Sequence, residues 1–358
     1  MLMFEPTGLP ATPEISAILT TYNRAHLLPR VLEGLAAQRL AAHRFEIVVI
    51  DDGSTDETQA ILAAWAERLP MRVLRQAQSG LAAAKNLGIF ACRAPIIVFL
   101  DDDDVADSNL LIGHLSAHLR HPDVNVAVLG YTDLAADIAD LPVMRHVTGA
   151  GSQLFSYGWM KPGQMLSYRE FWGGRSSCKR ALLIEHGIFN PIFRFGCEDI
   201  ELAWRLAPMG LRVVYQPSAR ATMIRGLTFR DFCHRARRQG RSQWAFANLH
   251  GAQEVRDYCE IDQALALWPK VAADITGILR WVEGLDAMMR ARGTAVPALA
   301  TDTQADIDEA YATAFFLCRV QGIAEAAGLP PIFKRPEDLP VSRMDFLDWG
   351  VQSDGKTL

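Results

Sequence analysis

The chain has 358 residues, with 36 basic and 41 acidic side chains and a formal net charge of −5. Half of the residues are hydrophobic and 22% are charged, which is typical of a folded globular protein and not of a disordered chain. The length predicts one large domain with an appendage, or two domains. A charge balance this close to neutral argues against general binding of nucleic acid through its phosphate backbone.

The six cysteines are scattered and form no C-x-x-C pair, which argues against a zinc ribbon or a disulfide scaffold and favours a reducing compartment. No apolar run approaches the roughly 20 residues that span a bilayer. The first residues, MLMFEPTGLPATPE, contain too short an apolar run and too much Pro and Glu for a signal peptide. We therefore expect a cytoplasmic protein without a transmembrane segment.

The first half of the chain alternates short apolar runs with amphipathic stretches. Strands are expected at residues 15–20, 45–50, 71–74, 96–100 and 124–129, and helices at 24–40, 55–68, 81–92 and 108–120. Continuous apolar strands that alternate with helices indicate a mostly parallel sheet covered on both faces. The predicted fold class is therefore α/β.

The second half of the chain is less regular at first and then helical. Residues 134–168 are rich in Gly, Ser, Pro and aromatic side chains, so long loops are expected there. A helix is expected at 180–186 and another that opens near Glu198. Beyond about residue 245 the pattern is helical, with 10 basic and 17 acidic residues. The first 245 residues are then slightly positive, which suits an anionic ligand.

Acidic residues follow two of the predicted strands. Asp51 and Asp52 come after the strand at 45–50, and four aspartates, 101–104, come after the strand at 96–100. Ligands of such sheets bind outside the carboxyl ends of the strands, so both groups are expected at one edge. Four consecutive aspartates repel one another and favour a hard cation such as Mg²⁺ or Mn²⁺. The alternative is a solvated loop in which one Asp caps the next helix.

A third stretch, QSGLAAAKNLG at residues 78–88, opens a predicted helix. Its small residues would let the helix approach the sheet, and Lys85 and Asn86 would point toward the same edge. A small-residue packing face without a ligand is an equally good interpretation of this stretch alone.

Six motifs in this order and spacing resemble the family-2 glycosyltransferases, whose nucleotide-binding fold is called GT-A. They are TTYNR (20–24), VVIDDGSTDET (48–58), QSGLAAAKNLGI (78–89), IIVFLDDDD (96–104), FWGGRSSCKRALLIEHGIFNPIF (171–193) and RFGCEDIELAWRL (194–206). The resemblance covers about residues 13 to 244. It predicts a GT-A domain at 13–245. The flanking residues lie outside the resemblance: they form a tail at 1–12 and, from the helical pattern, a C-terminal extension at 246–358 that would mediate a homodimer or dock a partner.

The resemblance implies the transfer of a sugar from a nucleoside-diphosphate donor, most often a UDP-sugar, to a hydroxyl of a carbohydrate or another acceptor. Asp101 and Asp103 match the family's D-x-D pattern and would hold Mn²⁺ or Mg²⁺, which would neutralise the leaving diphosphate. Among the donor-site residues, Asp52 would accept a hydrogen bond from the base. The full set of implied donor-site residues is Thr21, Tyr22, Arg24, Asp52, Lys85, Asp102, Gly174 and Arg225.

Inversion at the anomeric carbon by one displacement needs a general base on the acceptor hydroxyl. Asp199 matches the family's base position, and Glu198 beside it would orient the acceptor. The dipole of the helix that begins here would favour a charged carboxylate. The plain alternative is a charged first turn of a helix.

This sequence departs from the family's pattern at two places. The family's loop usually reads Gly-Gly-Asn, and here Arg175 follows Gly174. Met223 stands near an expected His that would contact metal or diphosphate, so metal binding would be weaker, or Arg225 would contact phosphate instead. Residues 238–244 match a loop that closes over the donor. Trp172 would stack on a sugar or belong to the core.

Two other functions remain open at this point. A divalent-metal phosphatase would use an Asp nucleophile at the same strand ends and would not bind nucleoside diphosphates tightly. A non-catalytic nucleotide-sugar-binding module would explain the missing His, although Asp103 and Asp199 are intact. The sequence names neither the sugar nor the acceptor.

Overall fold

The computed structural model describes residues 2–4, 12–292 and 301–330. The chain forms two compact units. The first, called the α/β unit below, consists of Met1–Ala139 and Phe155–Arg225, and the second, called the helical unit, consists of Asp140–Leu154 and Gly226–Leu358. Among the described residues, no helix combines the length and the apolar character that crossing a bilayer requires.

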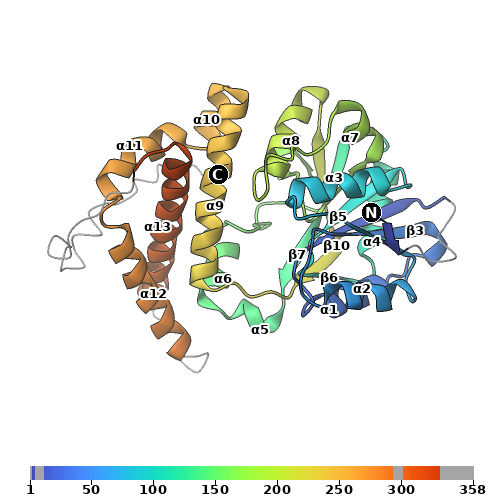
Figure 1. Cartoon of the computed structure of the whole chain (residues 1–358), viewed down its shortest axis with the longest axis horizontal. Helices are drawn as coiled ribbons and strands as arrows, with labels where there is room; N and C mark the ends of the chain where they lie inside the picture. Colours follow the sequence, from blue (N-terminus) through green and yellow to red (C-terminus); the bar gives the residue numbers. More distant parts are fainter. Residues whose placement is uncertain (1, 5–11, 293–300, 331–358) are drawn as a thin grey trace. The chain divides into compact units, whose positions relative to one another are not determined.

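The α/β unit is built on one sheet, in which the described strands follow the order β1-β4-β3-β2-β5-β9-β7-β10-β6, with β8 paired to β10. Figure 1 labels β3, β5, β6, β7 and β10 of this sheet. The strands are β1 (Leu2–Phe4), β2 (Ile15–Thr21), β3 (Phe45–Asp51), β4 (Met71–Arg75), β5 (Ile96–Leu100), β6 (Asp104–Ala106), β7 (Val126–Leu134), β8 (Met165–Leu166), β9 (Ser176–Lys179) and β10 (Arg212–Met223).

The centre of the sheet is parallel, as predicted. β2 pairs in parallel with β3 and β5, and β3 pairs in parallel with β4, so these strands end at one edge. The sheet as a whole is mixed, because β9 runs antiparallel between β5 and β7. The chain re-enters the sheet at β9 from the strand-end side, and this reverses the direction of that strand.

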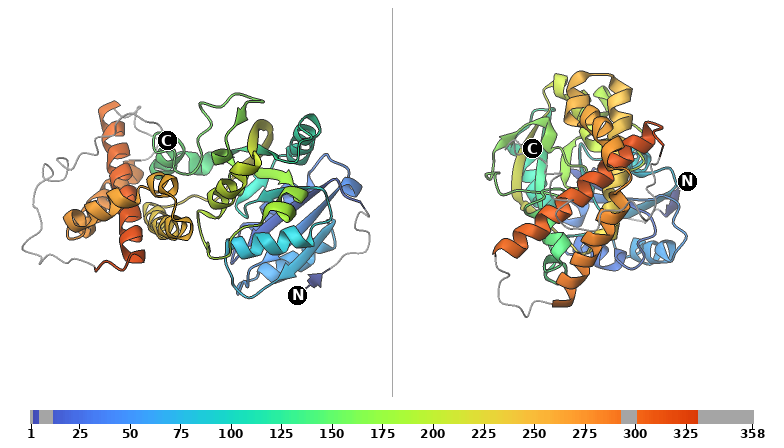
Figure 2. Two further views of the ribbon diagram at one scale, coloured as in Figure 1. Left: turned by 90° about the horizontal axis from the view of Figure 1, so that it is seen from above. Right: turned by 90° about the vertical axis from the view of Figure 1, so that its left-hand side faces the viewer.

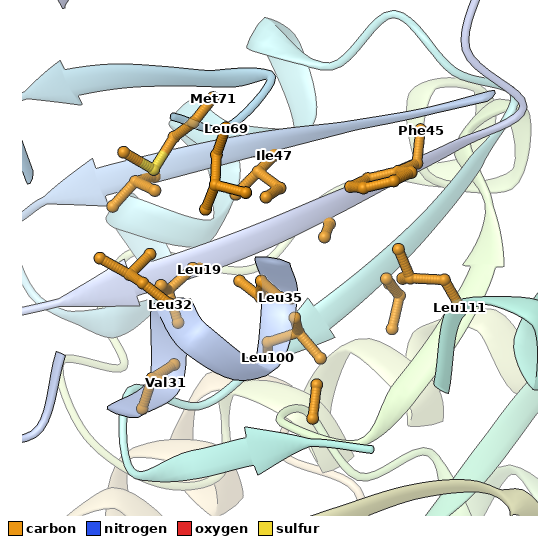
Figure 3. Close-up of a cluster of buried hydrophobic side chains, with 14 of the residues drawn as sticks. Leu19, Val31, Leu32, Leu35, Phe45, Ile47, Leu69, Met71, Leu100 and Leu111 are labelled. Atoms are coloured by element: carbon orange, nitrogen blue, oxygen red, sulfur yellow. The ribbon is translucent and has the colours of Figure 1, made fainter. Parts of the chain in front are cut away.

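Helices cover both faces of this sheet. Successive residues of a strand point to opposite faces. Ile15, Ala17 and Leu19 therefore join one buried core and Ile18 the other. Figure 3 shows the first core. Its helices are α1 (Leu28–Ala36), α2 (Thr58–Ala66) and α4 (Leu110–Arg120), and those of the second are α3 (Leu81–Ala91), α7 (Arg180–His186) and α8 (Glu198–Leu206).

The described part of the helical unit consists of α6 (Pro142–Thr148), α9 (Phe229–His250), α10 (Gln253–Tyr258), α11 (Ile261–Val271), α12 (Ile275–Arg292) and α13 (Thr301–Ala326). α13 lies across α9 (Figure 2). A Cβ on Gly240 would lie 2.0 Å from the carbonyl oxygen of Arg319, and one on Gly322 would lie 1.9 Å from that of Arg237. The two helices therefore cross in close contact because each has a glycine there.

The observed boundaries differ from the predicted ones. The predicted boundary at 245/246 lies inside α9, which starts at a capping box on Thr228 and continues to His250. The loop expected at 238–244 is wrong for the same reason. Within the predicted tail, residues 2–4 form β1 and pair with β4. The predicted long loops at 134–168 contain α5 (Ala136–Ala139), α6 and β8.

Candidate active site

Two loops at the carboxyl edge of the sheet are tied together by Asn23. This residue adopts a left-handed backbone conformation with φ of 53°. Its side-chain oxygen accepts the Thr55 N–H at 2.7 Å, and its own N–H donates to Ser54 Oγ at 2.9 Å. Thr21, the last residue of β2, is buried, and the following Tyr22 is 37% exposed. The turn after β2 thus presents an aromatic ring beside the turn after β3.

Asp52 anchors the turn that leads into α3. Its Oδ1 accepts hydrogen bonds from Gln76 Nε2 at 2.7 Å and from the Ser79 N–H at 2.9 Å, and its Oδ2 accepts the Gly80 N–H at 2.9 Å. Gly80 has φ of 96°, which favours glycine. A carboxylate offers about four acceptor positions, so Asp52 retains roughly one for a ligand.

The aspartate cluster, defined as residues 101–104 after β5, encloses a buried arginine. The Arg175 guanidinium lies 3.7 Å from Asp101 Oδ2 and 3.6 Å from Asp104 Oδ2, and its side chain is only 12% exposed. It also lies over the ring of Phe155, 4.7 Å from the centroid. Thr132 Oγ1 donates to Asp104 Oδ2 at 3.2 Å. Arg175 therefore supplies positive charge inside the cluster.

Two further arginines approach the cluster from different elements. Arg24, in the turn after β2, places its Nε 3.7 Å from Asp102 Oδ1. Arg225, just beyond β10, donates from its Nε to Asp103 Oδ2 at 2.6 Å. Four carboxylates thus face three guanidinium groups, and every aspartate of the cluster has an arginine within 4 Å.

The cluster nevertheless has more carboxylates than guanidinium groups. Burial and the neighbouring Asp103 raise the pKa of Asp102 to about 7, against the opposing charge of Arg24. Burial also raises the pKa of Asp104 to about 8, although Arg175 opposes this shift. Asp104 Oδ1 is buried and has no hydrogen-bond partner among the described residues. The site therefore favours additional positive charge.

Two consecutive glycines lie between this cluster and Asp199. The Gly173 N–H donates to Asp199 Oδ2 at 3.0 Å. A Cβ on Gly173 would lie 2.6 Å from Lys85 Nζ, and one on Gly174 would lie 1.9 Å from Asp101 Oδ2. A side chain at either position would displace Lys85 Nζ or the Asp101 carboxylate, so the two glycines let the turn lie directly between Asp101 and Asp199.

Lys85, Glu198 and Asp199 form the other side of the turn. Lys85 Nζ lies 3.1 Å from Glu198 Oε1, and both residues are buried. Burial opposes the charge on Lys85, but the carboxylates of Glu198, Asp101 and Asp199 outweigh burial and raise the pKa of Lys85. Burial and Asp199 raise the pKa of Glu198. Glu198 thus holds Lys85, while Asp199 on the first turn of α8 is partly exposed.

Two family models match this chain. The model of glycosyl transferase family 2 matches residues 16–169. The model of glycosyl transferase family group 2 matches residues 96–281, which is more than half of the chain. The chain belongs to the family-2 glycosyltransferases. The family resemblance predicted from the six motifs is thereby confirmed.

Curated relatives of this glycosyltransferase match over part of their length. Validoxylamine A glucosyltransferase of Streptomyces hygroscopicus subsp. jinggangensis is 30% identical over 229 residues, which cover 58% of this chain and 54% of that protein. Hyaluronan synthase of Pasteurella multocida is 27% identical over 225 residues, which cover 55% of this chain and 23% of that protein. The chain therefore spans about half the length of the first relative and less of the second.

Solved structures confirm the GT-A fold of this glycosyltransferase. The mannosyltransferase PcManGT from Pyrobaculum calidifontis, in complex with GDP-Man and Mn²⁺, has a TM-score of 0.53 at 20% identity, over 87% of this chain and 86% of that one. S. aureus TarS 1–349 has a TM-score of 0.50 at 17% identity, over 90% of this chain and 94% of that one.

The structure brings most of the predicted site residues of this glycosyltransferase together through the contacts above. The sequence did not predict that Arg175 lies between Asp101 and Asp104. The only indication was that Arg175 stands where the family's loop usually has Asn. Asn86 has a structural role, because its side chain donates to and accepts from the backbone of Phe189 in hydrogen bonds of 2.7 and 3.0 Å. Trp172 is partly buried and packs on Tyr157, with ring centroids 5.4 Å apart.

Proposed function

We propose that this glycosyltransferase moves a sugar from a nucleoside-diphosphate donor to the hydroxyl group of a carbohydrate or another acceptor, with inversion. The observation that carries the proposal is the two-glycine turn, which holds the Asp199 carboxylate on one side and touches Asp101 of the aspartate cluster on the other. A candidate base and a candidate donor site thus contact the same turn.

A UDP-sugar is the proposed donor. One curated relative is a glucosyltransferase, and a solved structure of TarS 1–349, with a TM-score of 0.50, is in complex with UDP-GlcNAc. The exposed ring of Tyr22 offers a stacking surface for the base, beside Thr21 and the remaining acceptor position of Asp52. Arg24 and Arg225 offer guanidinium groups, which bind phosphate oxygens through paired hydrogen bonds.

Mn²⁺ or Mg²⁺ is the proposed cofactor. The residues fit such an ion, because the donor atoms are hard carboxylate oxygens and the buried Asp104 Oδ1 lacks a partner among the described residues. Asp103 and Asp101 would hold it, and its charge would offset the negative charge that grows on the leaving diphosphate. Asp102 would contact the ribose of the donor.

Asp199 is the proposed general base. The Gly173 N–H holds its Oδ2 and the Ile200 N–H donates to its Oδ1 at 2.8 Å, so the carboxylate has a fixed direction. As the acceptor oxygen forms its bond to the anomeric carbon and the bond to the diphosphate breaks, Asp199 takes the acceptor proton. Glu198 acts indirectly by holding Lys85 beside this carboxylate.

A thermal-shift screen tests the proposal. UDP, GDP, UDP-glucose, UDP-GlcNAc and GDP-mannose are each added with and without Mn²⁺. A ligand at about 100 times its Kd stabilises the folded state by about 2.7 kcal/mol. We expect UDP and UDP-sugars with Mn²⁺ to raise the melting temperature most. If none of these nucleotides raises it, the proposal is wrong.

A second assay separates the alternative functions. Release of phosphate from p-nitrophenyl phosphate without nucleotide binding would favour the phosphatase. Binding of UDP-glucose without any release of UDP, to water or to an added acceptor such as validoxylamine A, would favour a non-catalytic binding module. The proposed function predicts UDP release and no phosphatase activity.

A further inference from the structure

We propose that Arg225 is the internal counter-ion of Asp103 and keeps a divalent cation off this carboxylate until the donor diphosphate arrives. The metal site would thus be completed by the donor rather than preformed. This inference rests on the proposed function, because it assumes that the aspartate cluster receives a nucleoside diphosphate together with the cation.

Contacts from both side chain and backbone fix Arg225 to Asp103. The Arg225 Nε donates to Asp103 Oδ2 at 2.6 Å, and the N–H of the preceding Ile224 donates to the Asp103 carbonyl oxygen at 2.8 Å. Asp103 is only 6% exposed. An ion pair between a guanidinium and a buried carboxylate is a charge-assisted hydrogen bond, so an approaching cation must compete with it.

The protein alone supplies an incomplete metal site. Within residues 2–4, 12–292 and 301–330, no group of three or more His, Cys, Asp or Glu side chains is arranged to hold a metal ion. Met223, near the position where the sequence comparison expected a His, is buried. The missing ligands must therefore come from water or from the diphosphate, as is common for Mg²⁺ sites.

Of the three arginines at the cluster, Arg225 combines exposure with a contact to a proposed metal ligand. Arg24 is equally exposed at 30%, but it pairs with Asp102, which is the proposed ribose contact. Arg175 is confined between two aspartates and Phe155, with a side chain that is 12% exposed. The Arg225 side chain is 30% exposed and contacts the carboxylate expected to hold the metal. A diphosphate presents several charged oxygens to a guanidinium, so Arg225 would move from Asp103 to the donor and leave the carboxylate to the cation.

This exchange has a thermodynamic consequence. If the nucleotide removes Arg225 from Asp103, nucleotide binding raises the affinity for the cation. By linkage the cation then raises the affinity for the nucleotide by the same factor. Removing the guanidinium should raise the cation affinity of the nucleotide-free protein and shrink the coupling.

The experiment measures Mn²⁺ binding to the full chain by electron paramagnetic resonance of free Mn²⁺, without nucleotide and with saturating UDP. In the wild-type protein we expect UDP to increase Mn²⁺ affinity at least tenfold. In Arg225→Met we expect Mn²⁺ alone to bind about tenfold more tightly than to wild type, and the effect of UDP to be smaller. Arg220→Met is the matched control, because Arg220 lies on β10 and pairs with the exposed Asp133.

Several outcomes decide the inference. Adding Asp103→Asn to Arg225→Met should abolish the gained Mn²⁺ affinity, which locates the ion. If folded Arg225→Met, checked by circular dichroism and melting, binds Mn²⁺ no better than wild type, the inference is wrong. If that variant does not fold, equal Mn²⁺ affinity of wild type with and without UDP still contradicts it. A failure of the proposed function would look different from a failure of this inference, because neither UDP nor any nucleotide sugar would then bind.

Discussion

Two arginine–carboxylate clusters, one in each unit of this molecule, differ in burial. In the α/β unit, Arg175 lies 3.6 and 3.7 Å from its two aspartates with 12% of its side chain exposed. In the helical unit, Arg237 and Arg241 both make short contacts with Glu325, yet their side chains are 37% and 52% exposed. Of these two clusters, the one with the longer contacts is the more buried.

We expect the burial of an ion pair, more than the distance between its charged atoms, to decide how much the pair contributes to stability. Exposed ion pairs contribute about 0–1 kcal/mol, since solvent screens them. Removing one partner of a buried pair destabilises by about 3–5 kcal/mol, because a charge is left uncompensated. The helical unit is held instead by the close crossing at Gly240 and Gly322 and by stacked rings such as Tyr311 and Phe315. We therefore expect the Arg175 pairs of the α/β unit to contribute more to stability than the Glu325 pairs of the helical unit.

The largest expected effect is on catalysis. Asp199→Asn removes the proposed base, and we expect UDP release from UDP-glucose to fall about 10³-fold, within the range for general-base catalysis. Asp133→Asn, which changes an exposed acid of the same unit, should leave the rate within about twofold. A rate for Asp199→Asn near that of wild type would remove Asp199 from the mechanism.

The next largest effect concerns the buried cation. Arg175→Met leaves Asp101 and Asp104 without their shared guanidinium, and we expect a loss of about 3 kcal/mol in the free energy of unfolding. Urea denaturation measures it, with the exposed Arg220→Met as the control. If both variants lose the same small amount of unfolding free energy, buried and exposed ion pairs do not differ in their contribution to stability.

A pair of buried histidines predicts acid sensitivity in the α/β unit. Ser177 Oγ lies 2.8 Å from His114 Nδ1 and 2.8 Å from His118 Nε2. Burial lowers the pKa of His114 to about 3 and that of His118 to about 2. The unfolded chain binds these protons first, so stability is complete above about pH 6.5 and falls as the pH is lowered, by up to about 1.4 kcal/mol per pH unit for each histidine.

Urea denaturation between pH 7 and pH 4 measures this slope. His114→Gln should make it shallower by about 1 kcal/mol per pH unit, because one buried group no longer takes up a proton on unfolding. His26→Gln changes an exposed histidine and should leave the slope unchanged. Equal slopes for wild type and His114→Gln would contradict the prediction that His114 takes up a proton only on unfolding.

The smallest expected effect is in the helical unit. Glu325→Gln removes the carboxylate that Arg237 and Arg241 share, and we expect a loss of less than about 1 kcal/mol, since all three side chains are partly exposed. UDP release should be unchanged. A loss as large as that of Arg175→Met, measured in the same urea series, would overturn the ranking by burial.

Much of the fold and part of the site follow from local sequence. Apolar runs predicted the central strands and placed both aspartate groups at one edge of the sheet, and the family resemblance added Gly174 and Asp199 as site residues. The arginine contacts were not predictable in the same way, because Arg225 reaches Asp103 across 122 residues. The continuous α9 was missed because the resemblance favoured a loop where a helix is stabilised by packing on α13.

The account's central claim is that the aspartate cluster holds the donor while Asp199 acts on the acceptor. Calorimetric titration of UDP-glucose in Mn²⁺ tests it most directly. We predict that Asp199→Asn binds UDP-glucose within about twofold of wild type and that Asp103→Asn binds it at least tenfold more weakly. Equal loss of binding in both variants, or no loss in Asp103→Asn, would contradict the division of the site into donor and acceptor sides.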